Sequence, residues 1–282
     1  MLDFLKAVIY GILEGITEWL PISSTGHLIL LEKLLPFSET SEGFFDMFDV
    51  VIQLGAILAV VVLYWKKLWP FALTGAERKE NEGSVIKKHT FFMWLKIIVA
   101  CLPAAVIGIL LDDLVNEHFY NEISVAVALI VFGVIFILME KFVVSKGTSK
   151  VKEVADITMM MALEIGIFQI LAAIFPGTSR SGATIIGALL IGISRQAAAE
   201  FTFFLAVPVM FGASLLKILK FGFGFTGHEA IVLLLGCIVS FGVSLVVLRC
   251  FIGYIKKHDF KPFGWYRIAL GIVVLVSSFF LK

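Results

Sequence analysis

Long apolar runs dominate the chain and are separated by short polar segments. Six of these runs are long enough to cross about 30 Å of hydrocarbon as α-helices. They are Phe44–Trp65, Phe91–Leu111, Ile123–Met139, Phe201–Leu219, Ala230–Leu248 and Phe263–Leu281. The pattern predicts an all-α polytopic membrane protein in which residues 1–282 form a single integral membrane domain.

Four further apolar runs are too short to span a bilayer alone, and they form two pairs, each of which flanks a proline. The pairs are Phe4–Leu13 with Leu28–Leu35 and Met159–Phe175 with Ala183–Ile193. Backbone that leaves a helix at membrane depth has to be buried in protein or line a cavity. We therefore expect each pair to form a re-entrant helix hairpin, which enters and leaves the membrane on one side.

The two proline-containing breaks also mark an internal repeat. Twenty-seven positions separate Pro21 from Phe48, and the same number separates Pro176 from Phe203. Each half then holds one re-entrant hairpin and three transmembrane helices, and an odd number of spans inverts the second half. This predicts an inverted-topology repeat. The predicted boundaries are about 1–145 for repeat one and about 150–282 for repeat two.

Composition and charge agree with a membrane protein and orient it. Of the 282 residues, 60% are hydrophobic and 16% are charged, and the net charge of +1 argues against a nucleic-acid partner. Lys and Arg gather in 66–88, 141–152 and 256–267, whereas 112–122 contains neither. By the positive-inside rule the basic loops are cytoplasmic, so both termini are expected outside. The first hairpin then enters from outside, and the site is expected to open to the outer face.

The first break carries paired carboxylates and a hydroxyl–imidazole pair. Glu14 and Glu18 are four positions apart, so both side chains project from one face of a helix. Two carboxylates that face a phosphate repel it unless a cation intervenes. We therefore expect both to bind a divalent cation, Mg²⁺ or Ca²⁺. Ser24 and His27 are three positions apart, which suits either a nucleophile activated by a base or a base that activates water.

The second break carries hydroxyls and an arginine. Two helix N-termini that face one cavity would form an anion site, and phosphate is a common ligand of such sites. Arg180 adds a planar guanidinium that can bind two phosphoryl oxygens at once. The candidate substrate-binding side chains around it are Ser23, Thr25, Ser179, Ser181, Thr184 and, in the first full span, Gln53.

The pattern alone leaves other interpretations open. Glu14 and Glu18 also suit the wet face of an amphipathic surface helix, and Arg180 also suits a structural ion pair. Inverted repeats with broken helices are typical of secondary transporters, so a lipid flippase or an anion transporter is the alternative function. A transporter has no need of a base beside a hydroxyl, and the group Glu18, Ser24 and His27 therefore favours an enzyme.

Both motifs resemble those of the bacterial undecaprenyl-diphosphate phosphatase family, also known for bacitracin resistance. That family carries (E/Q)GxTExLPxSSxxH and PGxSRSGxT. Here they read EGITEWLPISSTGH from Glu14 to His27 and PGTSRSGAT from Pro176 to Thr184. The resemblance implies a metal-dependent hydrolase of the bacterial plasma membrane. Its substrate would be undecaprenyl diphosphate, and its products would be undecaprenyl phosphate, a lipid carrier for cell-wall synthesis, and inorganic phosphate.

The resemblance also assigns roles to the motif residues. Glu14, Glu18, Ser24 and His27 match the catalytic positions of the family, and Arg180 matches its phosphate-binding arginine. Bacitracin would meet the protein only indirectly, through the shared lipid. A homodimer is left open, and so is transport of a prenyl phosphate through the same inverted-repeat site.

Overall fold

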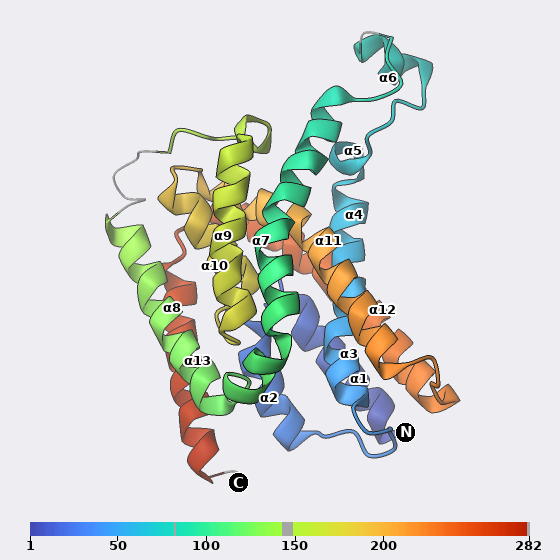
Figure 1. Cartoon of the computed structure of the whole chain (residues 1–282), viewed down its shortest axis with the longest axis vertical. Coiled ribbons are helices and arrows are strands. Elements are labelled where there is room, and N and C mark those ends of the chain that lie inside the picture. Colours follow the sequence, from blue (N-terminus) through green and yellow to red (C-terminus); the bar gives the residue numbers. More distant parts are fainter. Residues whose placement is uncertain (82, 143–148, 281–282) are drawn as a thin grey trace.

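The computed structural model describes residues 1–81, 83–142 and 149–280. Within these residues the chain forms α-helices and one 3₁₀ turn, and no β-strand (Figure 1). The helices are α1 Leu2–Thr17, α2 Ser24–Leu34, α3 Phe44–Val51, α4 Gln53–Leu63, α5 Trp65–Leu68, α6 Gly75–Glu80, α7 Lys88–His118, α8 Glu122–Phe142, α9 Met159–Ile174, α10 Arg180–Leu190, α11 Arg195–Phe221, α12 Gly227–Ile255 and α13 Lys261–Phe280. The predicted all-α class is confirmed.

Six segments of the described chain are long and apolar enough to cross a membrane, and each coincides with a predicted span. They are α3 together with α4, the first part of α7, α8, α11, α12 and α13. The prediction of a polytopic membrane protein is therefore confirmed. The first span is interrupted at Ile52, where α3 ends and α4 begins.

The four shorter apolar runs are also helical, and their lengths match in pairs. α1 and α9 each have 16 residues, and α2 and α10 each have 11. At 1.5 Å per residue these helices are about 24 Å and about 16 Å long, less than the hydrocarbon thickness.

The breaks begin earlier than their prolines. α1 ends at Thr17, four residues before Pro21, and α9 ends at Ile174, two residues before Pro176. A proline disfavours helical backbone in the residue before it, so a helix tends to end ahead of the proline. The breaks thus include residues ahead of each proline, and the proline itself is not the last residue of either helix.

Glycines allow neighbouring helices to pack closely against each other. A Cβ at Gly11 of α1 would lie 2.7 Å from the carbonyl oxygen of Gly236 in α12. Gly133 of α8 and Gly264 of α13 face each other, because a Cβ on either would lie 2.7 Å from the other's carbonyl oxygen. Small residues at such contacts are typical of membrane helices, whose backbones approach closely.

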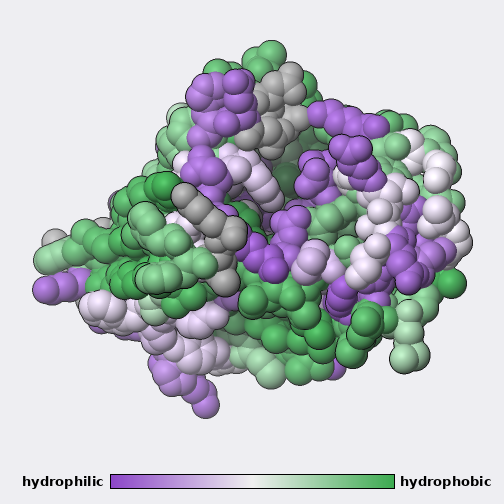
Figure 2. Space-filling model, turned by 90° about the horizontal axis from the view of Figure 1, so that it is seen from below, coloured by the Kyte–Doolittle hydropathy of each residue, from purple (hydrophilic) through white to green (hydrophobic). Residues whose placement is uncertain are grey.

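The two ends of the molecule differ. Both chain termini lie at one end, whereas α6 lies at the opposite end (Figure 1). Seen from the end with the termini, hydrophilic residues surround a hollow, and much of the remaining surface is hydrophobic (Figure 2). A polar hollow in an otherwise apolar protein is a natural place for a site that acts on a charged group.

Candidate functional site

The two breaks, which are far apart in the sequence, are joined by an ion pair. Nη2 of Arg180 donates to Oε1 of Glu18 at 2.8 Å, and the side chains are only 13% and 7% exposed. Nη1 of Arg180 donates to the carbonyl oxygen of Thr202 in α11 at 3.0 Å. The predicted convergence of the two motifs is therefore present in the structure.

A serine in an unusual backbone conformation precedes each second helix. Ser23 and Ser179 are the N-caps of α2 and α10, with φ of 72° and 70°. They are the two non-glycine residues with positive φ among those described. Such conformations cost about 1–3 kcal/mol each and cluster at functional sites. Oγ of Ser179 accepts a hydrogen bond from the Gly182 amide, whereas Oγ of Ser23 is buried without a partner in the described chain.

A small cavity of about 170 Å³ lies between the two breaks. Much of its lining consists of residues predicted from the motifs. The predicted residues on the lining are Glu18, Ser23, Ser24, Thr25, Gln53, Ser179 and Arg180. Ser24 and Arg180 are the first residues of α2 and α10, so two helix N-termini meet at this cavity. Free amides and the helix dipole favour an anion there.

Ser181 and Thr184 lie outside this lining and stabilise the arginine helix. Oγ of Ser181 donates to the carbonyl oxygen of Glu18 at 3.2 Å. Oγ1 of Thr184 donates to the Arg180 carbonyl at 3.0 Å and lies 2.9 Å from Oγ1 of Thr202. In this structure Ser181 thus joins the two breaks and Thr184 bonds the backbone of Arg180, and their predicted role in substrate binding stays a prediction.

His27 points towards α13. Its Nδ1 lies 2.7 Å from the Ser23 carbonyl oxygen, which can only accept, so Nδ1 carries the proton. Nε2 lies 2.7 Å from the hydroxyl of Tyr266, and the two rings stack with centroids 5.6 Å apart. In the neutral imidazole Nε2 accepts from that hydroxyl. Both ring nitrogens are thus engaged, and neither bonds to Ser24.

Glu14 lies behind the cavity and is fully buried. Neither of its carboxylate oxygens receives a hydrogen bond from the described residues. The charged groups that act on it electrostatically are the carboxyls of Glu18 and Asp49 and the guanidinium of Arg180. Carboxylates have no donors, so this group needs a shared proton or a bound cation. Buried oxygens without donors are the ligands that hard divalent cations prefer, and the residues present therefore fit such an ion.

Sequence reasoning missed three residues that contact the site or its residues. They are Thr202, Tyr266 and Arg267. A charge within an apolar run was an available signal for Arg267, because charges in membrane spans usually have a function. Thr202 and Tyr266 carried no such signal, since their roles depend on contacts between distant segments.

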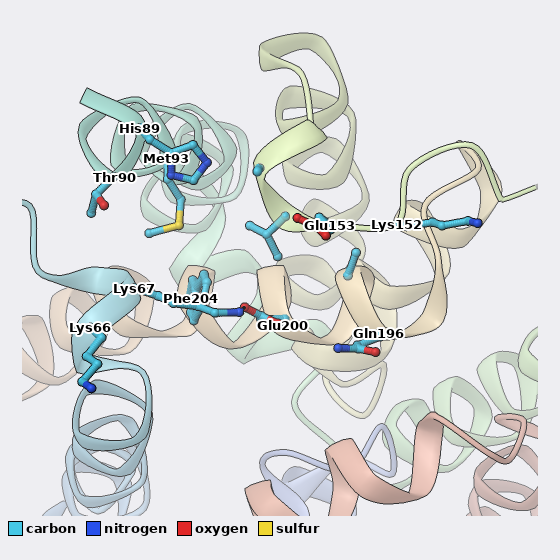
Figure 3. A pocket seen from close by; sticks show the side chains of 13 residues that line it. Lys66, Lys67, His89, Thr90, Met93, Lys152, Glu153, Gln196, Glu200 and Phe204 are labelled. Carbon is cyan, nitrogen blue, oxygen red and sulfur yellow. Dashed lines mark hydrogen bonds and ion pairs between the residues drawn. The ribbon is translucent and has the colours of Figure 1, made fainter. Parts of the chain in front are cut away.

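A larger cavity, of about 450 Å³, lies where α5, α7 and α11 meet the segment 152–155 (Figure 3). Lys67 reaches towards Glu200 of α11, and the two form an ion pair. The other basic residues on the lining, Lys66, His89 and Lys152, belong to the predicted cytoplasmic loops or adjoin them. The lining contains none of the predicted site residues, so this cavity is separate from the candidate site.

Asp3, Glu39 and His228 form a separate group whose ligand atoms lie close together. Burial alone would raise the pKa of Asp3. Hydrogen bonds from Lys6 and from the Glu39 and Ser38 amides outweigh burial and hold that pKa below its ordinary value. Asp3 is therefore ionised at neutral pH, and its oxygens are already occupied. We interpret this group as a structural contact that fastens the start of α1.

Comparison with known proteins identifies relatives along nearly the whole chain. The family model for bacitracin resistance protein BacA matches residues 7–273. A protein of Desulfitobacterium hafniense named undecaprenyl-diphosphatase is 57% identical over 98% of this chain and 96% of its own length. Proteins of the same name from Enterococcus faecalis and Acetivibrio thermocellus are 55% and 54% identical, each over 98% of both chains.

Arg180→Lys is expected to weaken the binding of inorganic phosphate at least tenfold. A lysine ammonium keeps the charge but cannot present two parallel donors. Calorimetric titration of the purified protein with phosphate measures the change. Arg249→Lys, at an exposed position of α12, is the matched control. Phosphate affinity within threefold of wild type in Arg180→Lys would remove Arg180 from the anion site.

Proposed function

Because the chain belongs to the bacitracin resistance protein BacA family, we propose that it is an undecaprenyl-diphosphatase of the bacterial plasma membrane. It hydrolyses undecaprenyl diphosphate to undecaprenyl phosphate and inorganic phosphate, and so recycles a lipid carrier for cell-wall synthesis. The observation that carries the proposal is the small cavity at which Ser24 and Arg180 meet at two helix N-termini.

Arg180 and the two N-termini bind the diphosphate in this proposal. Nη1 and Nη2 donate to the Thr202 carbonyl and to Glu18, whereas Nε is buried without an acceptor in the described chain. An incoming phosphoryl group accepts from Nε and exchanges with the Glu18 carboxylate at Nη2. Donors aimed at the phosphoryl oxygens stabilise the charge of the transition state, because they need little reorganisation during the reaction.

Ser24 is the proposed nucleophile. Its Oγ attacks the terminal phosphorus, the bond from that phosphorus to the bridging oxygen breaks, and undecaprenyl phosphate leaves. The hydroxyl proton passes to His27, and water then hydrolyses the phosphoserine to release inorganic phosphate and restore Ser24. His27 can take the proton only after Nε2 exchanges its hydrogen bond with Tyr266.

Glu14 and Glu18 are the proposed residues for a divalent cation, Mg²⁺ or Ca²⁺. The support is the pair of Glu14 oxygens that are buried without hydrogen-bond donors in the described chain. When bound, such an ion would offset the repulsion between the carboxylates and the diphosphate and polarise the phosphoryl group.

We also propose that the two halves, about 1–145 and 150–282, form an inverted repeat with re-entrant hairpins. The equal helix lengths of the two hairpins support it. So does the reciprocal packing: α1 packs on α12 of the second half, and α9 packs on α7 of the first. Likewise α2 contacts α13, and α10 contacts α8. Such an exchange of partners is expected from a pseudo-two-fold axis.

The proposed orientation has both termini outside and the site open to the outer face. The position of α6 and its basic loop at the end opposite the termini supports this arrangement (Figure 1).

The activity is tested by phosphate release from a prenyl diphosphate. Wild-type protein in detergent is expected to release phosphate, to lose the activity with a chelator, and to regain it with Mg²⁺ or Ca²⁺. Glu18→Gln is expected to lower the rate at least a hundredfold and to weaken the apparent metal affinity. Glu117→Gln, at a side chain that is 77% exposed, is the control. Transport of the lipid without phosphate release would favour the flippase.

The roles of Ser24 and His27 are tested by kinetics. Ser24→Ala is expected to abolish turnover, and His27→Ala is expected to lower kcat far more than it raises KM, because the loss falls on the transition state. Tyr266→Phe frees Nε2 of His27 and is expected to keep or raise kcat. If Ser24→Ala retains activity within tenfold of wild type, Ser24 does not attack and water is the nucleophile.

Cysteine labelling in right-side-out vesicles tests the orientation. An impermeant reagent is expected to modify Glu39→Cys and Glu117→Cys from outside, and Lys88→Cys only after the membrane is opened. The background carries alanine at the three native cysteines, Cys101, Cys237 and Cys250. Labelling with the opposite sidedness would reverse the proposed topology.

A further inference from the structure

α13 places a fully buried arginine between the two breaks. The guanidinium of Arg267 donates to the carbonyl oxygen of Pro21 at 3.3 Å in the first break. In the second break it donates to the carbonyls of Gly177 at 2.9 Å and Thr178 at 2.8 Å. One side chain thus hydrogen-bonds to both loops, and its acceptors in the described chain are neutral backbone groups.

A buried arginine of this kind is costly to retain. Burying a charge without a counter-ion is unfavourable. The rings of Phe132 and Phe136, with centroids 5.9 and 6.0 Å from Cζ, offset part of that cost by cation–π interaction. The close contact between Gly133 and Gly264 brings α13 near enough for the side chain to reach the loops. For packing alone, an apolar side chain would serve at lower cost.

The position of the acceptors indicates what the guanidinium does. Each acceptor lies one or two residues before Ser23 or Ser179, the N-caps with positive φ. Strained backbone persists only where its surroundings hold it. Arg267 holds the carbonyls next to both strained residues, and these residues set the direction of the two helix N-termini.

We propose that Arg267 is a positioning residue that clamps the two breaks together, so that Ser24 and Arg180 face the same diphosphate. The diphosphate in this inference comes from the proposed function, whereas the contacts of Arg267 with both breaks do not depend on it. Loss of the clamp lets the two loops move apart, and the cavity then no longer matches a diphosphate held from both sides. A displacement of about 1 Å between reacting groups is enough to lower the rate of an enzymatic reaction about a hundredfold.

Arg267→Lys is the decisive variant, and Arg249→Lys is its matched control at an exposed position. An ammonium is a single point and cannot hydrogen-bond to both loops as the planar fork does. KM for the prenyl diphosphate is expected to rise at least fivefold in Arg267→Lys and to stay unchanged in the control. A loss of folded enzyme would lower the apparent kcat and leave KM unchanged, so KM distinguishes positioning from stability.

Hydrogen–deuterium exchange tests the clamp without any assay of activity. In Arg267→Lys, exchange is expected to quicken in both 20–25 and 176–181 while α7 and α12 keep their protection. If the wild-type protein releases no phosphate, the proposed function is refuted. The exchange measurement in Arg267→Lys still tests whether Arg267 holds the two loops together. Unchanged exchange in either loop, or KM within twofold of wild type, would overturn the proposal.

A second variant covers the case in which Arg267→Lys does not fold. A Cβ at Gly182 would lie 3.1 Å from Nη1 of Arg267, so Gly182→Ala displaces the guanidinium without removing it. The nearest neighbours of that Cβ are Arg267, Phe136 and Ser179, all outside residues 20–25. Faster exchange is therefore expected in 20–25 only if the guanidinium transmits the change. Unchanged exchange there in Gly182→Ala would contradict the clamp.

Discussion

The ion pair between Glu18 and Arg180 is the contact on which the rest of the site depends. A charge placed at membrane depth is costly unless it is paired, so a glutamate in one break and an arginine in the other favour a fold in which the breaks meet. Once they meet, the hydroxyls of both motifs and two helix N-termini lie around one cavity. The pairing that stabilises the charges therefore also assembles the groups that suit a phosphate.

The same meeting point holds strained backbone. Ser23 and Ser179 adopt positive φ just before the helices whose N-termini face the cavity. Close glycine contacts bring α1 to α12 and α8 to α13, and the buried guanidinium of Arg267 reaches carbonyls one or two residues before each serine. Close packing outside the site thus provides the rigid surroundings that let unfavourable local conformations persist within it.

The sequence predicted the spans well because a span is defined by the length of an apolar run, which is a local property. The motif residues on the cavity lining were also predictable, since hydroxyls and charges within apolar sequence require a polar environment. The direction of His27 was not predictable, because it depends on Tyr266, more than two hundred residues away. The three carbonyl contacts of Arg267 likewise depend on tertiary contacts.

Glu18 links the anion side of the proposed site to its cation side. In this structure its carboxylate accepts from Arg180 and also interacts with the buried carboxyl of Glu14. In the proposed mechanism a diphosphate bound to Arg180 would replace Glu18 there, and the released carboxylate would add to the unpaired negative charge at Glu14. A divalent cation held by these glutamates would offset that repulsion, and its affinity would rise once Arg180 no longer neutralises Glu18. Because such coupling is reciprocal, each ligand would raise the affinity for the other, so neither half of the site would need to hold its ligand tightly alone.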